Sequence, residues 1–158
     1  MEKLDQIWTA WEATHHLSHQ KAKPGRLLLK RYGLTANSPP DLIRFRSRQP
    51  FFEKGRRVGT WPALLVMLQD RSGAARSILE VFTVWHEKQE PAPRPLGLML
   101  PIPEAARQEV AEVLAKRLGR CGSGQLVQTR YGLLPGGDVV GWLDMINSGS
   151  SNLYSCSP

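Results

Sequence analysis

Cysteine, acidic residues and long hydrophobic runs are all scarce in this sequence of 158 residues. It has 2 cysteines, which are too few for a disulfide framework, so we expect a reduced, cytoplasmic protein. No hydrophobic run approaches the roughly 20 residues of a membrane-spanning helix, and the N-terminus lacks the apolar segment of a secretory signal. We therefore expect no membrane partner. Hydrophobic residues still make up 41% of the chain, which excludes a wholly disordered protein.

The shortage of acidic residues leaves a net charge of +7, and most of the basic excess is in one segment. Between residues 20 and 60 there are eleven basic residues and only two acidic ones, so this segment carries +9 and the rest of the chain −2. The eleven are Lys21, Lys23, Arg26, Lys30, Arg31, Arg44, Arg46, Arg48, Lys54, Arg56 and Arg57. Clustered lysine and arginine are typical of proteins that bind a polyanion, although a solvated surface can have the same composition.

The first part of the chain predicts two helices and a strand. Apolar residues recur at helical spacing over residues 2–18, and a second short helix is expected over residues 24–32. Residues 41–46 then alternate with period two, so Ile43 and Phe45 should face one way, and Arg44, Arg46 and Arg48 the other. Residues 50–59 are expected to form a loop.

The remaining elements complete an α+β fold with a central antiparallel sheet. Two apolar strands, 62–69 and 76–85, flank a turn at Asp70–Gly73, and their hydrophobicity on both faces favours a central position. After a proline-rich crossing at 87–103, residues 104–118 predict a helix. Residues 125–134 and 139–146 predict a C-terminal hairpin, with a short helix near Trp142 as the alternative. We expect one domain over residues 1–146 and a polar tail over 147–158.

No motif predicts catalysis or metal binding. His15 and His19 would share one helix face, but the second ligand pair that a metal site needs is missing. The sequence contains no G-x-S-x-G, no C-x-x-C and no phosphate-binding loop with its lysine. We therefore predict no catalytic residue, no metal and no cofactor, and whether the protein is an enzyme stays open.

Basic residues interleaved with aromatic ones are the strongest functional pattern. Single-stranded nucleic acids are bound by basic grooves that follow the phosphates and by aromatic rings that stack on the bases. The candidate phosphate contacts are Lys30, Arg31, Arg44, Arg46, Arg48, Lys54, Arg56 and Arg57. Phe51 and Phe52 are the candidate stacking residues, and either could instead belong to the core.

Several short blocks in the first half of the chain resemble a known family. They are Leu27–Leu34, Pro40–Phe45, Pro50, Gly59–Val66 and Asp70–Gly73. In this order they look like the segment upstream of the Toprim domain in DNA primases and primase-helicases of phages, plasmids and integrative elements. The resemblance covers about residues 8–85. It implies the nucleic-acid context of a mobile element.

The sequence also departs from that family pattern. Ser47 stands where the family often has histidine, and Leu79–Phe82 replaces another family block. The upstream zinc ribbon and the acidic Toprim motifs are missing, so the resemblance does not imply polymerase activity.

The sequence therefore predicts a non-enzymatic nucleic-acid-binding or replication-accessory protein. Its partner would be a single-stranded nucleic acid or a nucleoprotein complex. The alternative is a phage- or plasmid-type inhibitor or adaptor that binds a host nucleoprotein complex, with residues 91–103 and Trp142 as candidate contacts. The first hypothesis depends on five arginines, Arg44, Arg46, Arg48, Arg56 and Arg57, sharing one face.

Overall fold

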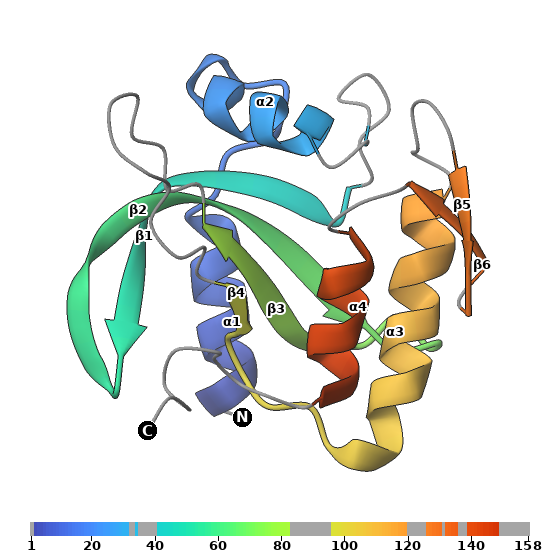
Figure 1. Cartoon of the computed structure of the whole chain (residues 1–158). Helices are drawn as coiled ribbons and strands as arrows, with labels where there is room; N and C mark the ends of the chain where they lie inside the picture. Colours follow the sequence, from blue (N-terminus) through green and yellow to red (C-terminus); the bar gives the residue numbers. More distant parts are fainter. Residues whose placement is uncertain are drawn as a thin grey trace.

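The computed structural model describes residues 2–31, 34, 41–82, 96–119, 126–130, 132–135 and 139–148. In these residues helices surround a four-stranded antiparallel sheet, which confirms the α+β class (Figure 1). The elements are α1 Glu2–Glu12, the short 3-10 helix η1 Gln20–Ala22, α2 Lys23–Arg31, β1 Ile43–Glu53, β2 Arg56–Gln69, β3 Ala75–Phe82, β4 Leu96–Leu98, α3 Glu104–Gly119, β5 Leu126–Thr129, β6 Gly132–Pro135 and α4 Val139–Ser148. None of the helices described is long and apolar enough to cross a membrane.

The main sheet has the order β1-β2-β3-β4, so β2 is central as predicted. Residues 63–68 of β2 are all buried, which explains why this stretch is apolar on both faces. The turn to β3 also follows the sequence. The Asp70 carboxylate accepts hydrogen bonds from the backbone N–H groups of Ser72 and Ala74, at 3.0 and 3.1 Å, and Gly73 has a φ of +89°.

Helices α1 and α2 cover opposite faces of the sheet (Figure 1). Phe45 and Leu64 lie against α2, where a Cβ on Gly25 would come within 2.7 Å of the Phe45 ring. Glycine at this position therefore allows the helix to approach the sheet closely. On the opposite face the Arg44 guanidinium lies over the Trp11 ring of α1, 5.8 Å from its centroid.

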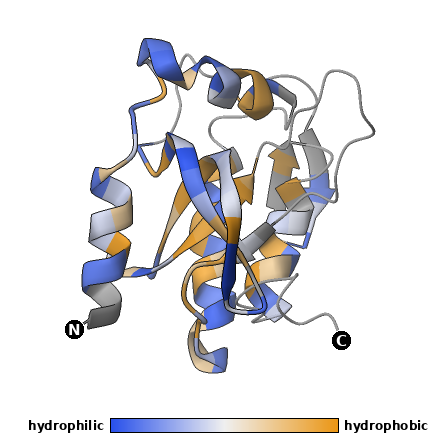
Figure 2. Cartoon of the chain, turned by 90° about the vertical axis from the view of Figure 1, so that its left-hand side faces the viewer, coloured by the Kyte–Doolittle hydropathy of each residue, from blue (hydrophilic) through white to orange (hydrophobic). Residues whose placement is uncertain are grey.

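Helices α3 and α4 pack together at the far end of the sheet, beside β5 and β6 (Figure 1). The predicted helix at 104–118 is confirmed as α3, which buries Val110, Leu114 and Leu118. Hydrophobic residues concentrate on the strands inside the molecule (Figure 2), and α3 and α4 contribute buried side chains to the same core. One hydrophobic cluster includes side chains from Ile7 in α1 to Ile146 in α4.

The C-terminal hairpin expected from 125–134 and 139–146 is not confirmed. β5 and β6 pair with each other instead, and the helical alternative is right for the residues that follow, which form α4. Val139, Trp142 and Ile146 recur at helical spacing, so they occupy one buried helix face. Trp142 is 1% exposed, which removes it as a candidate protein contact.

The first helix is shorter than predicted and ends at Glu12. Beyond it, His15 exchanges two backbone hydrogen bonds with Phe45, of 2.6 and 2.9 Å. The chain must become extended to form this bridge, so the helix cannot continue to residue 18. Trp8, placed by its spacing on the apolar stripe, is 47% exposed.

Candidate nucleic-acid interface

The outer part of the β1–β2 hairpin extends away from the rest of the sheet (Figure 1). In the described pairings β3 pairs with residues Ala63 to Gln69 of β2, whereas the pairing of β1 with β2 continues to Arg56, at the start of β2. We call residues 48–59 the basic arm. It carries Arg48, Lys54, Arg56 and Arg57.

The basic arm is a hairpin and not the loop predicted over residues 50–59. Lys54 and Gly55 form a two-residue turn with φ values of 53° and 79°, as a type I′ turn requires. This tight turn lets the strand ladder continue to the pair Glu53 and Arg56. The register of β1 against β2 shifts twice, between Arg46 and Gln49 and between Phe51 and Phe52. Such bulges increase strand twist and bending, which accounts for the curl of the arm in Figure 1.

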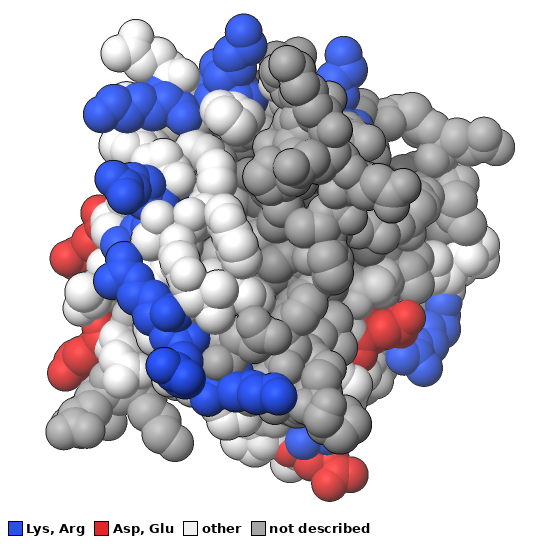
Figure 3. Space-filling view, turned by 60° about the vertical axis from the view of Figure 1, so that its left-hand side comes forward, with Lys and Arg blue, Asp and Glu red and all other residues white. Residues whose placement is uncertain are grey.

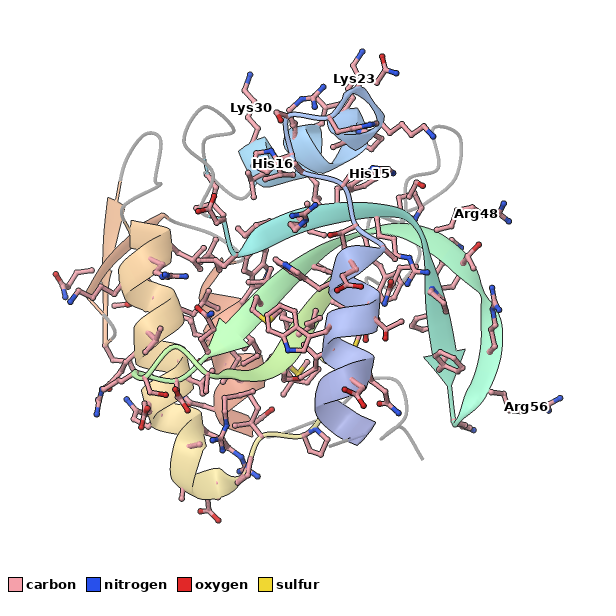
Figure 4. All side chains as sticks on the ribbon, turned by 180° about the vertical axis from the view of Figure 1, so that it is seen from behind. His15, His16, Lys23, Lys30, Arg48 and Arg56 are labelled. Carbon is pink, nitrogen blue, oxygen red and sulfur yellow. The ribbon has the colours of Figure 1, made fainter. Side chains whose placement is uncertain are left out.

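The four basic side chains of the arm are exposed. In the part of the chain that the structure describes, none of them forms an ion pair or a side-chain hydrogen bond. Arg48 and Arg56 point away from the body of the protein (Figure 4). Lysine and arginine side chains follow one side of the molecule from the level of α2 down to the hairpin (Figure 3). These cations are therefore available to an anionic partner.

The two inner arginines of β1 have intramolecular roles instead. Arg44 donates to the Thr14 carbonyl oxygen at 3.3 Å, and Arg46 donates to the Gln49 side-chain oxygen at 2.9 Å. Both are partly buried. Arg44 lies on the side of β1 opposite Phe45, as the alternation predicts, but α1 covers this side and the register shifts after Arg46. The five arginines therefore do not form one exposed face, and of the five only Arg48, Arg56 and Arg57 are exposed.

A second basic group lies on η1 and α2. Lys21, Lys23 and Lys30 are exposed, and Figure 4 shows Lys23 and Lys30 pointing outward at the α2 end of the molecule. The predicted contact Arg31 is the last residue of α2, and its side chain lies outside what the structure describes.

The two candidate stacking residues differ in exposure. Phe51 is 5% exposed and packs against Trp61 and Phe82, with ring centroids 4.6 and 5.3 Å apart. Phe51 therefore belongs to the core, where it anchors the arm, and the prediction that it could stack on a base is wrong. Phe52, across the register shift, is 48% exposed.

The histidines near the end of α1 lie in the connection to α2. The rings of His15 and His19 are stacked with centroids 4.4 Å apart. Burial, followed by the neighbouring His19, lowers the pKa of His15. Within the described residues no group of three or more His, Cys, Asp or Glu side chains could hold a metal ion. The scattered candidates His86, Cys121 and Cys156 lie outside those residues.

A cleft of about 680 Å³ lies between α1 and the inner side of the basic arm. It is lined by Gln6, Thr9, Ala10, Ala13, Arg46, Gln49, Pro50, Phe52, Gly55, Glu80, Leu98 and Met99. Its polar groups form a chain in which Arg46 donates to Gln49, and the Gln49 amide donates to the Glu80 carboxylate at 2.7 Å. Burial raises the pKa of Glu80 to about 7, and the hydrogen bond from Gln49 and the charge of Arg46 offset this only in part.

The sequence analysis did not select Gln49 or Glu80 as functional residues. Glu80 does have a sequence signal, because it is an isolated acid in the apolar strand Ile78–Phe82. Gln49 has no comparable signal, since its partner is 31 positions away in the chain.

No protein-family model, curated protein or solved structure matches this chain. The resemblance to the primase segment upstream of the Toprim domain therefore stays a prediction from the sequence.

Proposed function

We propose that this protein binds single-stranded nucleic acid through the basic arm. The observation that carries the proposal is a set of four exposed basic side chains that form no ion pair or side-chain hydrogen bond with any described residue, Arg48, Lys54, Arg56 and Arg57. Phosphate contacts by free cations release counterions and supply most of the affinity of such proteins. The half-exposed Phe52 adds a ring on which a base can stack.

Two further features support this proposal. A narrow, curved hairpin can lie along a flexible strand, whereas it offers little of the flat area that a stable protein interface needs. The basic groups on α2 and on the arm also follow the same side of the molecule (Figure 3), so they extend the positive surface beyond the hairpin.

The test is fluorescence anisotropy with a labelled oligo-dT 12-mer, measured from about 50 to 200 mM salt. We compare the wild type with Arg56→Gln/Arg57→Gln. The control is Lys116→Gln/Arg117→Gln, which removes the same charge from adjacent exposed residues of α3.

The arm variant should bind more weakly, and its plot of log affinity against log salt should be shallower by about 0.7 for each lost phosphate contact. The control should keep the wild-type slope. Absence of binding by the wild type at 50 mM salt would overturn the proposal, as would equal losses in the two variants.

The second candidate is an adaptor that binds a protein component of a nucleoprotein complex. It is favoured by two apolar residues of the arm, Phe52 and Val58, which are 48% and 53% exposed and lie close together, since Phe52 pairs with Arg57, the neighbour of Val58. Pull-downs from nuclease-treated lysate with the same pair of variants distinguish the two functions. A protein retained by the wild type and by the control, but lost with the arm variant, would support the adaptor.

A further inference from the structure

The cleft between α1 and the basic arm contains the partly buried carboxylate of Glu80. Glu80 accepts one hydrogen bond, from Gln49, to one of its two oxygens, and it forms no ion pair with any described residue. Gln49 is 3% exposed, and its amide oxygen is occupied by Arg46. Glu80 is thus the one carboxylate among the described residues that line this cleft, and it has spare capacity to accept hydrogen bonds.

The rest of the cleft suits a flat, largely apolar group. Ala10 of α1 and Ala13, just beyond it, line the cleft together with Pro50 and Phe52 of β1 and with Met99. The volume of about 680 Å³ lies within the range of sites that hold small molecules. A planar ring could stack on Phe52 while its polar edge reaches Glu80.

The cleft and the basic arm share residues. Phe52 and Gly55 line the cleft, and Gly55 lies between Lys54 and Arg56, two of the proposed phosphate contacts. A strand whose phosphates lie along the arm therefore has its bases within reach of the opening.

We infer that this cleft receives one base of the bound strand and that Glu80 selects guanine. The inference rests on the proposed function. Guanine presents two adjacent N–H donors, at N1 and N2, which match the two oxygens of a carboxylate. Adenine and cytosine offer one amino group each, whereas the N–H of thymine lies between two carbonyl oxygens that a carboxylate repels.

The affinity for guanine should depend on pH. Only an ionised Glu80 can accept both N–H bonds, and the pKa of Glu80 is about 7. Among the described residues that line the cleft, Arg46 is the one other charged side chain; α1 contributes the uncharged Gln6 and Thr9, β4 the apolar Leu98, and the residue after β4 the apolar Met99. Guanine affinity should therefore rise about tenfold from pH 6 to pH 8, as the ionised fraction of Glu80 increases.

The experiment compares oligo-dT 12-mers that carry a central dG, dA, dC, dT or abasic site, with the wild type and Glu80→Gln. The wild type should bind the dG oligomer about tenfold more tightly than the all-dT oligomer, with dA and dC between them. Glu80→Gln should bind all five within about twofold of one another, because an amide presents one acceptor and one donor. Arg56→Gln/Arg57→Gln should lower the affinity for all five oligomers and keep the preference for dG. This result would show that base selection in the cleft and phosphate binding by the arm are separate contributions.

A second measurement tests base binding in the cleft with nucleosides, which have no phosphate to contact the arm. Guanosine and thymidine are titrated into wild type and Glu80→Gln and followed by NMR, after thermal unfolding has shown that the variant is folded. Guanosine should shift signals of Phe52 and Met99 in the wild type only.

If the wild type binds all five oligomers with equal affinity, or if the dG preference survives in Glu80→Gln, the inference is overturned and the proposed function stands. If no oligomer binds, the proposed function fails, and guanosine binding alone then decides whether the cleft is a guanine site.

Discussion

The inner half of the β1–β2 hairpin, residues 43–47 and 60–69, and its outer half, the basic arm, both contain arginine and phenylalanine but differ in environment. In the inner half Phe45 lies between Arg44 and Arg46 in sequence, and in the outer half Phe52 pairs with Arg57 across the strands. In the inner half Phe45 is 1% exposed and Arg44 lies over Trp11 of α1. In the outer half Phe52 is 48% exposed and Arg56 points into solvent (Figure 4).

This difference arises from what covers each half. The inner half lies between α1 and α2, and its strand β2 also pairs with β3. Its Arg44 therefore contacts the segment after α1 and helps to hold α1 against the sheet. The outer half extends past these neighbours and is held by the turn at Lys54–Gly55 and by Phe51 at its base. A two-stranded hairpin has little stability of its own, so the arm can keep exposed charges only because the inner half is well packed.

The largest expected effect is the difference in stability between variants of Phe45 and Phe52. Phe45→Ala should lower the free energy of unfolding by about 3–5 kcal/mol, because it leaves a cavity under α2. Phe52→Ala should lower it by only about 1 kcal/mol, because about half of the side chain is exposed in the folded protein. Urea unfolding followed by tryptophan fluorescence measures both. Similar losses in the two variants would mean that the arm is part of the core.

The second effect tests Glu80, a partly buried carboxylate on β3 that accepts a hydrogen bond from Gln49 of the arm. The pKa of Glu80 is about 7 in the folded protein, against an ordinary value of 4.5, so between these values the folded state holds a proton that the unfolded chain has lost. Stability should therefore fall as the pH rises from about 4.5 to 7, by up to about 3 kcal/mol from this group. Urea unfolding at pH 4.5, 6 and 8 should show this loss in the wild type and a smaller one in Glu80→Gln. Equal pH dependence in both proteins would show that Glu80 is not the group responsible.

The third effect compares an inner with an outer arginine. Arg44→Gln should lower the free energy of unfolding by about 1–2 kcal/mol, because it removes the hydrogen bond to Thr14 and the contact with Trp11. Arg48→Gln should leave stability within about 0.5 kcal/mol of the wild type and weaken oligo-dT binding. Unfolding and anisotropy measured on the same samples check both. The division of roles is refuted if Arg44→Gln weakens binding more than Arg48→Gln does.

The smallest effect concerns the tip of the arm. Lys54 has a φ of 53°, in the left-handed region that asparagine adopts more easily than lysine. Lys54→Asn should raise the free energy of unfolding by about 0.5 kcal/mol, whereas the β-branched Lys54→Val should lower it. Thermal unfolding of the two variants is the measurement. A lower stability for the asparagine variant would argue against a type I′ turn.

The parts predicted well from the sequence are those with strong local patterns. The strand pair around Asp70–Gly73 and the helix α3 were placed correctly, because turn chemistry and apolar periodicity act over a few residues. Residues 139–146 predict a strand first and a helix only as the alternative, since short apolar runs fit either period, whereas the structure has the helix α4 there. For the candidate site, the sequence identified the exposed arginines of the arm but did not separate them from Arg44 and Arg46.

The sequence by itself determined the α+β class, the central strand and the concentration of positive charge between residues 20 and 60. These properties follow from composition and from patterns between near neighbours in the chain. Only the tertiary structure decided which arginines remain free and that Gln49 meets Glu80 in a cleft beneath the arm. The reason is that burial and hydrogen-bond partners depend on contacts between residues far apart in sequence, and two register shifts in β1 were enough to end the alternation on which the first assignment relied.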